Sequence, residues 1–371
     1  MKNKNVLFLT LHTFGLTGGI EQVCRTFSKT LSDLNIEQKI RSFTVLSMYD
    51  NQPDLNYIPQ SAFKGYHGKQ VAFGLASIKQ GLKADILILS HVHLLTFARI
   101  LKKLKPSLRI ILFVHGIEVW NTLERWKRQL LNKIEIWAVS HYTASRLTEV
   151  NKIEPNHIKI LNNCLDPYFL WPKEITKSAL LLERYGINPN QKVLLTICRL
   201  ASSEQYKGYD LIINCLKEIV KVYPDLIYLL VGKADAPEQE RIDKLIEKCG
   251  LEKNVTCTGY IKDAELGLHY QLADVFIMPS KAEGFGLVFI EAAAYGCAVI
   301  AGNKDGSTDA LLNGQLGELI DPEDATAIYQ STLHALNHPL EAESRLKQQY
   351  AVFNTFGYHN YTQKVSNLLG A

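Results

Sequence analysis

Short apolar segments alternate along the chain with longer segments of helical periodicity. A strand of a parallel sheet that is covered on both faces shows as a continuous apolar run, and helices usually connect such strands. In the first half this pattern predicts six strands, at residues 6–11, 39–46, 85–90, 109–116, 134–140 and 157–163. In the second half it predicts five, at residues 193–199, 226–232, 254–260, 275–280 and 298–302, with a short addition at 317–321. The alternation favours parallel sheets with helices on both faces.

The length of the chain and its prolines indicate how it divides. At 371 residues the chain is longer than a single hydrophobic core usually grows, and 47% hydrophobic residues are enough for two cores. A stretch with three prolines and a short helical pattern separates the two sets of strands. We predict two doubly wound α/β domains in tandem, at residues 1–170 and 191–352, joined by a linker region at residues 171–190.

One segment combines two carboxylates with glycines in a way that points to a ligand. In "EGFGLVFIEA", Glu283 precedes two glycines, and Glu291 lies in an apolar helical run whose neighbours three and four positions away are uncharged. An ionised carboxylate removed from water needs a hydrogen-bonding partner, so we expect one from another segment or from a ligand. The segment follows a predicted strand, and parallel sheets bind ligands at the carboxyl ends of their strands.

Three segments that follow predicted strands could accept an anion. The backbone N–H groups of Phe285, Gly286 and Leu287 begin a helix, where unpaired N–H groups attract negative charge. Arg199 and Lys207 in "CRLASSEQYKGYD" would suit a diphosphate, although such a basic pair is also common on solvated loops. Gly18 and Gly19 open a helix after the first strand, but a Gly-Gly pair is often only a turn. None of these segments is a dinucleotide fingerprint or a P-loop.

Charge is distributed unevenly along the chain. Residues 1–170 hold 22 Lys and Arg against 12 acids, a net +10, while residues 171–371 hold 19 against 25, a net −6. The basic half is either a solvated surface or a peripheral contact with anionic lipid; nothing indicates nucleic-acid reading. The seven cysteines include no closely spaced pair, which favours a reducing compartment without disulfides. No apolar run reaches the length of a membrane span.

Several segments together resemble the retaining glycosyltransferases of family 4. They are "LTGGIEQV", "FVHGIEVW", "CRLASSEQYKGYD", "VTCTGYI", "EGFGLVFIEA" and "DGSTDAL", which occur in the family's order and cover nearly the whole chain. The two glutamates around F-G-L are the most specific of these signals. The resemblance implies the GT-B fold, with two Rossmann-like domains facing a central cleft. It also implies an acceptor-binding N-terminal domain, joined by a C-terminal crossing helix at residues 353–371, and a donor-binding C-terminal domain.

The resemblance further implies roles for individual residues. The catalytic set would be His115, Glu283, Arg199 and Lys207. The donor-binding set would be Gly18, Gly19, Arg199, Lys207, Tyr260, Ile261, Glu283, Phe285, Gly286, Leu287 and Glu291. On the acceptor side the candidates are His91, His93 and His115. Arg199 and Lys207 would hold the donor diphosphate, Glu291 the ribose hydroxyls, Glu283 the sugar, and the turn at Tyr260 and Ile261 the base.

The resemblance implies transfer of a sugar from a UDP- or GDP-type donor to a hydroxyl of a glycan or lipid-linked glycan. We expect the protein to act in the cytoplasm, at the inner face of the membrane, in the synthesis of a cell-surface polysaccharide. We expect no cofactor and no metal, because the sequence lacks an Asp-x-Asp triplet. The resemblance implies front-face attack, with the departing phosphate receiving the proton of the acceptor; double displacement would require a nucleophilic carboxylate close to the anomeric carbon, and we nominate none. The alternatives are a nucleotide-sugar 2-epimerase and a non-catalytic nucleotide-sugar binding protein. The sequence departs from the commoner family pattern at Lys233, at Asp305–Gly306 and in the length of the loop between Arg199 and Lys207.

Overall fold

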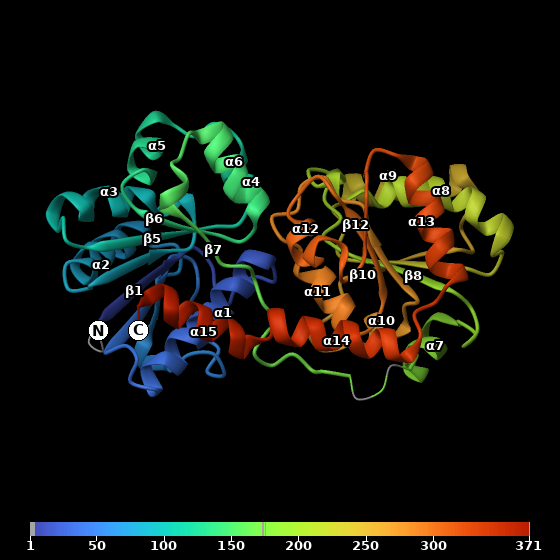
Figure 1. Cartoon of the computed structure of the whole chain (residues 1–371), viewed down its shortest axis with the longest axis horizontal. Helices are drawn as coiled ribbons and strands as arrows, with labels where there is room; N and C mark the ends of the chain where they lie inside the picture. The colour runs from blue at the N-terminus through green and yellow to red at the C-terminus, as the bar shows by residue number, and fades with distance from the viewer. Residues whose placement is uncertain (1–3, 173, 175, 371) are drawn as a thin grey trace. The chain divides into compact units, whose positions relative to one another are not determined.

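The computed structural model describes residues 4–172, 174 and 176–370, and the chain divides into two compact units (Figure 1). Unit 1 contains the described residues up to Tyr168 together with those from Phe356 onward, and unit 2 contains those from Phe169 to Thr355. Residues 171–190, interpreted above as a linker region, therefore fall within unit 2. Each unit is built around its own parallel sheet.

Unit 1 has a seven-stranded parallel sheet in the order β3-β2-β1-β4-β5-β6-β7. Its strands are β1 (Asn5–Thr10), β2 (Ser42–Ser47), β3 (Phe63–Gly65), β4 (Ile86–Leu89), β5 (Arg109–Val114), β6 (Glu135–Ala138) and β7 (Ile158–Ile160). Its helices are α1 (Gly19–Ile36), α2 (Gln70–Gly81), α3 (Leu95–Leu104), α4 (Ile117–Trp120), α5 (Arg125–Leu131), α6 (His141–Asn151) and α15 (Tyr358–Leu369). The six predicted strands are confirmed. The edge strand β3 was not predicted, because three residues with an exposed lysine in the middle carry no apolar pattern.

The C-terminal helix α15 is part of the core of unit 1. Tyr361, Val365 and Leu369 pack with Phe27 of α1 in the same buried cluster as the inward-facing residues of the sheet. At the amino ends of the strands, Arg109 forms an ion pair with Glu135 at 2.8 Å. The same guanidinium donates to the last carbonyls of α15, those of residues 368 and 369, at 2.7 and 2.9 Å. A cation at a helix C-terminus is favourable because the unpaired carbonyls there carry partial negative charge.

Unit 2 has a six-stranded parallel sheet in the order β10-β9-β8-β11-β12-β13. Its strands are β8 (Val193–Ile197), β9 (Ile227–Val231), β10 (Val255–Gly259), β11 (Val275–Met278), β12 (Ala298–Gly302) and β13 (Glu318–Ile320). Its helices are α7 (Ala179–Tyr185), α8 (Tyr209–Val222), α9 (Ala236–Cys249), α10 (Asp263–Leu272), α11 (Leu287–Ala294), α12 (Ser307–Ala310), α13 (Ala325–Asn337) and α14 (Ala342–Phe356). All six predicted strands of this half are confirmed.

The segment 353–371, expected as one crossing helix, consists of the end of α14 and the separate helix α15. Gly357 lies between them in an extended conformation, with φ −67° and ψ 145°. The helical segment is therefore interrupted at Gly357, close to the point where the chain passes from unit 2 into unit 1.

Strand order reverses once in each sheet, between β1 and β4 in unit 1 and between β8 and β11 in unit 2. A crevice forms at the carboxyl side of such a reversal, because the loops on either side turn to opposite faces of the sheet. The loops after β8 and β11 carry Arg199, Lys207 and Glu283. Those after β1, β4 and β5 carry the Gly18–Gly19 turn and His91, His93 and His115.

Candidate active site

The structure brings Lys207 and Glu283 together in unit 2. Lys207 ends the 3-10 helix Gln205–Lys207 before α8, Glu283 follows β11, and their side chains form an ion pair in which each is only 14% or 13% exposed. Burial by itself would lower the pKa of Lys207, but the adjacent charge of Glu283 outweighs it and raises that pKa above its ordinary value. Lys207 therefore remains positively charged beside the carboxylate of Glu283.

Gly208 allows the loop that carries Lys207 to approach the end of β11 closely. Gly208 has φ +80°, and a Cβ added there would lie 2.5 Å from the carbonyl oxygen of Pro279. Only glycine combines this left-handed conformation with such a close approach. The two loops are also joined through their backbones, since the N–H of Lys281 donates to the carbonyl of Tyr206 at 3.0 Å. The longer loop between Arg199 and Lys207 thus still brings the lysine to the end of β11.

Both peptide groups that flank Glu283 are held by the loop after β12. The N–H of Glu283 donates to Oδ2 of Asp305 at 2.7 Å, and its carbonyl accepts from the N–H of Gly306 at 2.8 Å. A Cβ on Gly306 would lie 2.1 Å from the carbonyl oxygen of Gly284, so this contact also requires glycine. Asp305 and Gly306, which had no predicted role, fix the backbone of Glu283.

Asp305 is fully buried, and its environment acts on its ionisation in opposite directions. Burial raises the pKa of Asp305 to about 7, and the nearby charge of Glu283 adds to that increase. Hydrogen bonds from Ser307, whose N–H donates at 2.9 Å, and from the N–H of Glu283 lower it. The carboxyl group can therefore change charge near neutral pH.

Arg199 occupies a more open position than Lys207. Its guanidinium is 71% exposed and forms an ion pair at 2.6 Å with Glu204, which is 13% exposed. Glu204 lies in the same loop after β8, so this pair restricts where the arginine reaches. The structure thus places a solvent-accessible cation and a buried one in one loop, both at the carboxyl side of the sheet.

Glu291 receives its hydrogen-bonding partner from another element, as expected. On α11 it is partly buried, and its Oε2 accepts from the hydroxyl of Tyr270 on α10 at 2.8 Å. The ring of Tyr270 stacks on Tyr295 with centroids 5.6 Å apart. Tyr270 was not singled out from the sequence, where a tyrosine in an apolar helix is indistinguishable from a core residue.

Two further segments of unit 2 carry predicted site residues, the start of α11 and the turn after β10. Gly286 caps α11 with φ +90°, and a Cβ there would overlap the ring of Phe289. Phe285 and Leu287 on either side are buried, 2% and 8% exposed. In the turn after β10, Tyr260 is 55% exposed.

In unit 1 the three predicted histidines gather at neighbouring strand ends. The Nε2 atom of His115, after β5, lies 2.8 Å from the carbonyl oxygen of Ser90, and the backbone N–H of His115 donates to Oε1 of Glu118 at 2.5 Å. After β4, the rings of His91 and His93 have centroids 4.4 Å apart. Burial lowers the pKa of His91 to about 4, with help from the charges of His93 and His115.

A carboxylate shapes the loop before the Gly18–Gly19 turn. Asp50 accepts backbone hydrogen bonds from Thr13 at 2.6 Å and from Gly15 at 2.7 Å. Gly18 then precedes α1 as its N-cap. The side chain of Glu21 lies directly over Gly18, where an added Cβ would be 2.3 Å from its Oε2. The start of α1 therefore already has an acidic side chain beside it.

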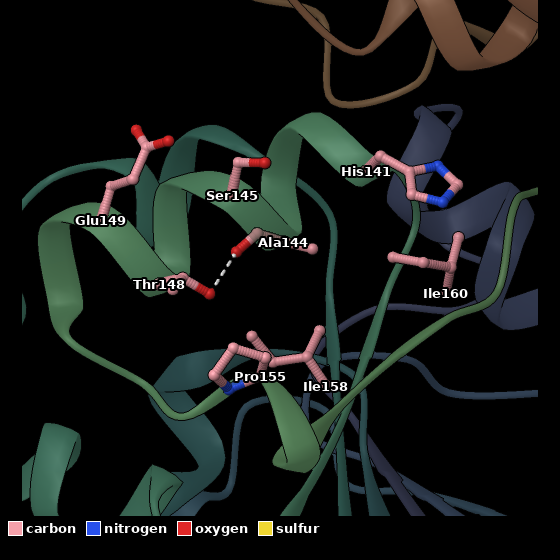
Figure 2. Close-up of a pocket in the computed structure, with 8 residues that line it drawn as sticks. All are labelled: His141, Ala144, Ser145, Thr148, Glu149, Pro155, Ile158 and Ile160. Atoms are coloured by element: carbon pink, nitrogen blue, oxygen red, sulfur yellow. Dashed lines mark hydrogen bonds between the residues drawn. The ribbon is translucent and has the colours of Figure 1, made fainter.

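A cavity of about 330 Å³ lies between α6 and the region of β7 in unit 1 (Figure 2). Its lining is polar along the helix and apolar opposite: His141, Ala144, Ser145, Thr148 and Glu149 on α6, and Pro155, Ile158 and Ile160 below. None of the predicted site residues lines it. Within the described residues, no three or more His, Cys, Asp or Glu side chains gather as they would around a metal ion.

Sequence comparison assigns both halves of the chain to glycosyltransferase families. The family described as Glycosyl transferases group 1 matches residues 180–351, and Glycosyltransferase Family 4 matches residues 17–169. Together these matches cover most of both units.

Individual relatives agree with this assignment. The GDP-mannose-dependent alpha-(1-6)-phosphatidylinositol monomannoside mannosyltransferase of Mycolicibacterium smegmatis is 30% identical over 247 residues, which cover 63% of this chain and 62% of the relative. The chain thus spans about six-tenths of the length of that enzyme. The 2-deoxystreptamine N-acetyl-D-glucosaminyltransferase of Niallia circulans is 26% identical over 365 residues, covering 93% of this chain and 89% of the relative.

Solved structures share the fold. HepE of Anabaena, crystallised in complex with UDP, has a TM-score of 0.78 at 19% identity, covering 99% of both chains. A glycosyltransferase of Rickettsia africae has a TM-score of 0.77 at 19% identity, covering 98% of this chain and 97% of that one. With two Rossmann-like parallel-sheet domains and both family matches, the chain belongs to the group 1, family 4 glycosyltransferases of the GT-B fold.

Proposed function

We propose that the chain is a retaining glycosyltransferase that moves a hexosyl group from a nucleoside-diphosphate sugar to a hydroxyl of a glycan or glycolipid. The observation that carries this proposal is the buried Lys207–Glu283 pair, with the backbone of Glu283 held by Asp305 and Gly306. These contacts fix the positions of the Lys207 cation and of the Glu283 carboxylate, to which we assign sugar binding. Stabilisation of a departing diphosphate requires charges that are fixed in this way.

In this proposal Lys207 and Arg199 bind the diphosphate of the donor. As the bond from the anomeric carbon to the phosphate oxygen breaks, negative charge grows on the leaving group, and both cations stabilise it. The acceptor hydroxyl attacks from the same face, and its proton passes to the departing phosphate, so the configuration is retained. His115 and Glu283 position the acceptor and the sugar, and neither is assigned a covalent role.

The nucleotide is assigned to Glu291 and the turn at Tyr260 and Ile261. A ribose hydroxyl donating to Glu291 would share that carboxylate with Tyr270, which orients it. Hydrogen bonds to a charged group contribute about 1.5 to 3 kcal/mol each. One relative is named as a GDP-mannose-dependent phosphatidylinositol monomannoside mannosyltransferase and another as an alpha-monoglucosyldiacylglycerol synthase. These names support a nucleotide-sugar donor and a lipid-linked acceptor. We place the reaction at the cytoplasmic face of a membrane, in the synthesis of a surface glycan.

The first test is calorimetric titration with UDP, GDP and ADP of the wild type and of the Glu291→Ala variant. We expect one nucleotide to bind and the variant to bind it at least about tenfold more weakly, which corresponds to about 1.4 kcal/mol. Glu240→Ala is the matched control, since Glu240 is an exposed glutamate of the same unit whose partner is Lys244. Equal affinity in the wild type and Glu291→Ala would show that Glu291 is structural.

The second test is turnover of the matching nucleotide-sugars with candidate acceptors. Transfer with retention, measured by NMR of the anomeric proton, supports the proposal, and an inverted product contradicts it. An epimer formed from the donor without any acceptor would instead identify a 2-epimerase. We expect turnover to persist in the presence of a chelator, since Lys207 and Arg199 supply the positive charge.

A further inference from the structure

Helix α2 of unit 1 carries an apolar stripe on its solvent side. Val71 and Leu75 on α2 are 78% and 70% exposed, and Leu82, the C-cap residue directly after the helix, is 44% exposed; their spacing places all three on one side. The opposite side, which includes Phe73 and Gly81, is buried. Single exposed apolar residues are ordinary, but a row along one helix indicates contact with another apolar surface.

The neighbouring helix α3 extends this surface. Ile100 and Leu104 are 41% and 58% exposed on α3. The two helices lie side by side (Figure 1) and pack against each other. At their contact, Gly74 of α2 faces the ring of Phe97. We call Val71, Leu75, Leu82, Ile100 and Leu104, with the lysines described next, the α2–α3 face.

The surroundings of these apolar residues are strongly basic. Residues 55–117 contain nine Lys and Arg and a single acid, Asp85, whose carboxylate accepts from the N–H of Asn5 at 2.8 Å. Some of the basic side chains are used internally, as when Lys105 donates to the carbonyl of Ala84 at 2.6 Å. Four exposed lysines make no side-chain hydrogen bond or ion pair with the described part of the chain: Lys69, Lys79, Lys83 and Lys103.

We propose that the α2–α3 face docks on an anionic lipid bilayer. Apolar side chains that enter the boundary between head groups and acyl chains, beside lysines that meet lipid phosphates, form the usual combination for peripheral binding. A second copy of the chain fits this surface less well. It would bring the lysines of two identical faces together, and like charges in an interface oppose association.

The position of the face links docking to the proposed reaction. Val71 and Leu75 lie in the first half of α2, which follows the carboxyl end of β3. His91 and His93, assigned to the acceptor, follow the carboxyl end of β4 in the same parallel sheet. The beginning of this face therefore lies at the same edge of the sheet as the proposed acceptor residues. This consequence rests on the proposed function, whereas the docking does not.

The test is co-sedimentation of the full chain with vesicles. Phosphatidylcholine vesicles containing about 30 mol% phosphatidylglycerol are compared with phosphatidylcholine alone over a series of salt concentrations. We expect the wild type to bind the anionic vesicles and to lose binding as salt increases. The variant with Val71→Ser and Leu75→Ser should bind at least about tenfold more weakly, which is about 1.4 kcal/mol. Lys79→Gln with Lys83→Gln should bind more weakly and depend less steeply on salt.

Ile36→Ser is the matched control, because Ile36 is 74% exposed at the end of α1 in the same unit and outside this face. It should bind vesicles like the wild type. The proposal would be overturned if the wild type did not bind anionic vesicles. It would also be overturned if the α2 variant bound them as well as the wild type. A wild-type dimer in sedimentation that the α2 substitutions convert to a monomer would overturn it too, since a second copy would then cover the face.

Nucleotide binding and transfer to a soluble acceptor are measured on the same variants without vesicles. If the α2 variant keeps both but loses vesicle binding, docking and the proposed function both stand. If the wild type binds vesicles but no nucleotide-sugar, the docking stands and the proposed function fails.

Discussion

The ion pair between Lys207 and Glu283 allows a quantitative test of how the site is built. Both side chains are mostly buried, 14% and 13% exposed. Removing one partner of a buried pair leaves an uncompensated charge and typically costs about 3 to 5 kcal/mol, whereas an exposed pair contributes about 0.2 to 1 kcal/mol. Because some solvent reaches this pair, we expect about 3 kcal/mol of lost unfolding free energy for Lys207→Met or Glu283→Gln alone.

The double variant tests the pairing itself. If each single substitution costs about 3 kcal/mol because the other charge is stranded, removing both should cost about 3 kcal/mol instead of about 6 kcal/mol. The assay is urea unfolding followed by circular dichroism and by hydrogen exchange of unit 2 amides, because the two units need not unfold together. The control is Lys221→Met with Glu218→Gln on α8, a pair that is 68% and 59% exposed, where coupling should stay below about 0.5 kcal/mol.

Additive effects at Lys207 and Glu283, within about 0.5 kcal/mol, would refute the argument that each charge stabilises the other. Turnover provides a separate result. The double variant should recover stability relative to the sum of the single variants but no sugar transfer, since the proposed reaction needs both groups. Recovered activity together with recovered stability would show that the pair only maintains the fold.

Three further predictions follow from individual contacts. Tyr270→Phe removes the hydrogen bond to Glu291 and should weaken nucleotide binding several-fold by calorimetry, while Tyr209→Phe, which loses a comparable 2.6 Å bond to Glu238, should not. The folded-state pKa of Asp305, about 7, lies above its ordinary value of 3.8, so its contribution to stability is full below about pH 4 and is lost as pH rises through 7. Asp305→Asn should therefore remove a pH-dependent term of up to about 4 kcal/mol from urea unfolding measured between pH 4 and 8; an unchanged slope would contradict the assignment. His91, with a pKa of about 4 against an ordinary 6.5, should titrate near pH 4 by NMR, and the stability it contributes should be present above about pH 6.5 and fall as pH decreases toward 4. A midpoint near 6.5 would show that its ring is solvated.

The strands could be predicted because each buried strand is a local apolar run. A sheet covered on both faces needs side chains such as those of residues 193–197 and 275–278 to be apolar at every position, and this signal survives without tertiary information. β3 was missed for the same reason, since its three residues include an exposed lysine. β3 is a strand because its backbone pairs with β2, which its own sequence pattern does not indicate.

The contacts within the site were less accessible from the sequence. Glu291 lacks a countercharge on its own helix, which correctly required a partner elsewhere, but nothing in the spacing distinguished Tyr270 from the other tyrosines. Asp305 departs from the family pattern, and the sequence did not predict a role for it. The structure shows that the loop after β12, which contains Asp305, holds the backbone of Glu283. These are contacts between residues 21 and 22 positions apart, fixed by how helices and loops pack.

The sequence by itself determined the number and type of most strands, the two-domain α/β class, and the residue types gathered at the strand ends, because apolar runs, helical periodicity and glycines act locally. Only the tertiary structure decided that Lys207 pairs with Glu283, that Arg109 holds the end of α15, and that the apolar stripe of α2 lies beside exposed lysines. Each of these depends on which faces of distant elements meet. The packing of each unit sets this, because burial and close backbone approach at glycines such as Gly208 select one arrangement.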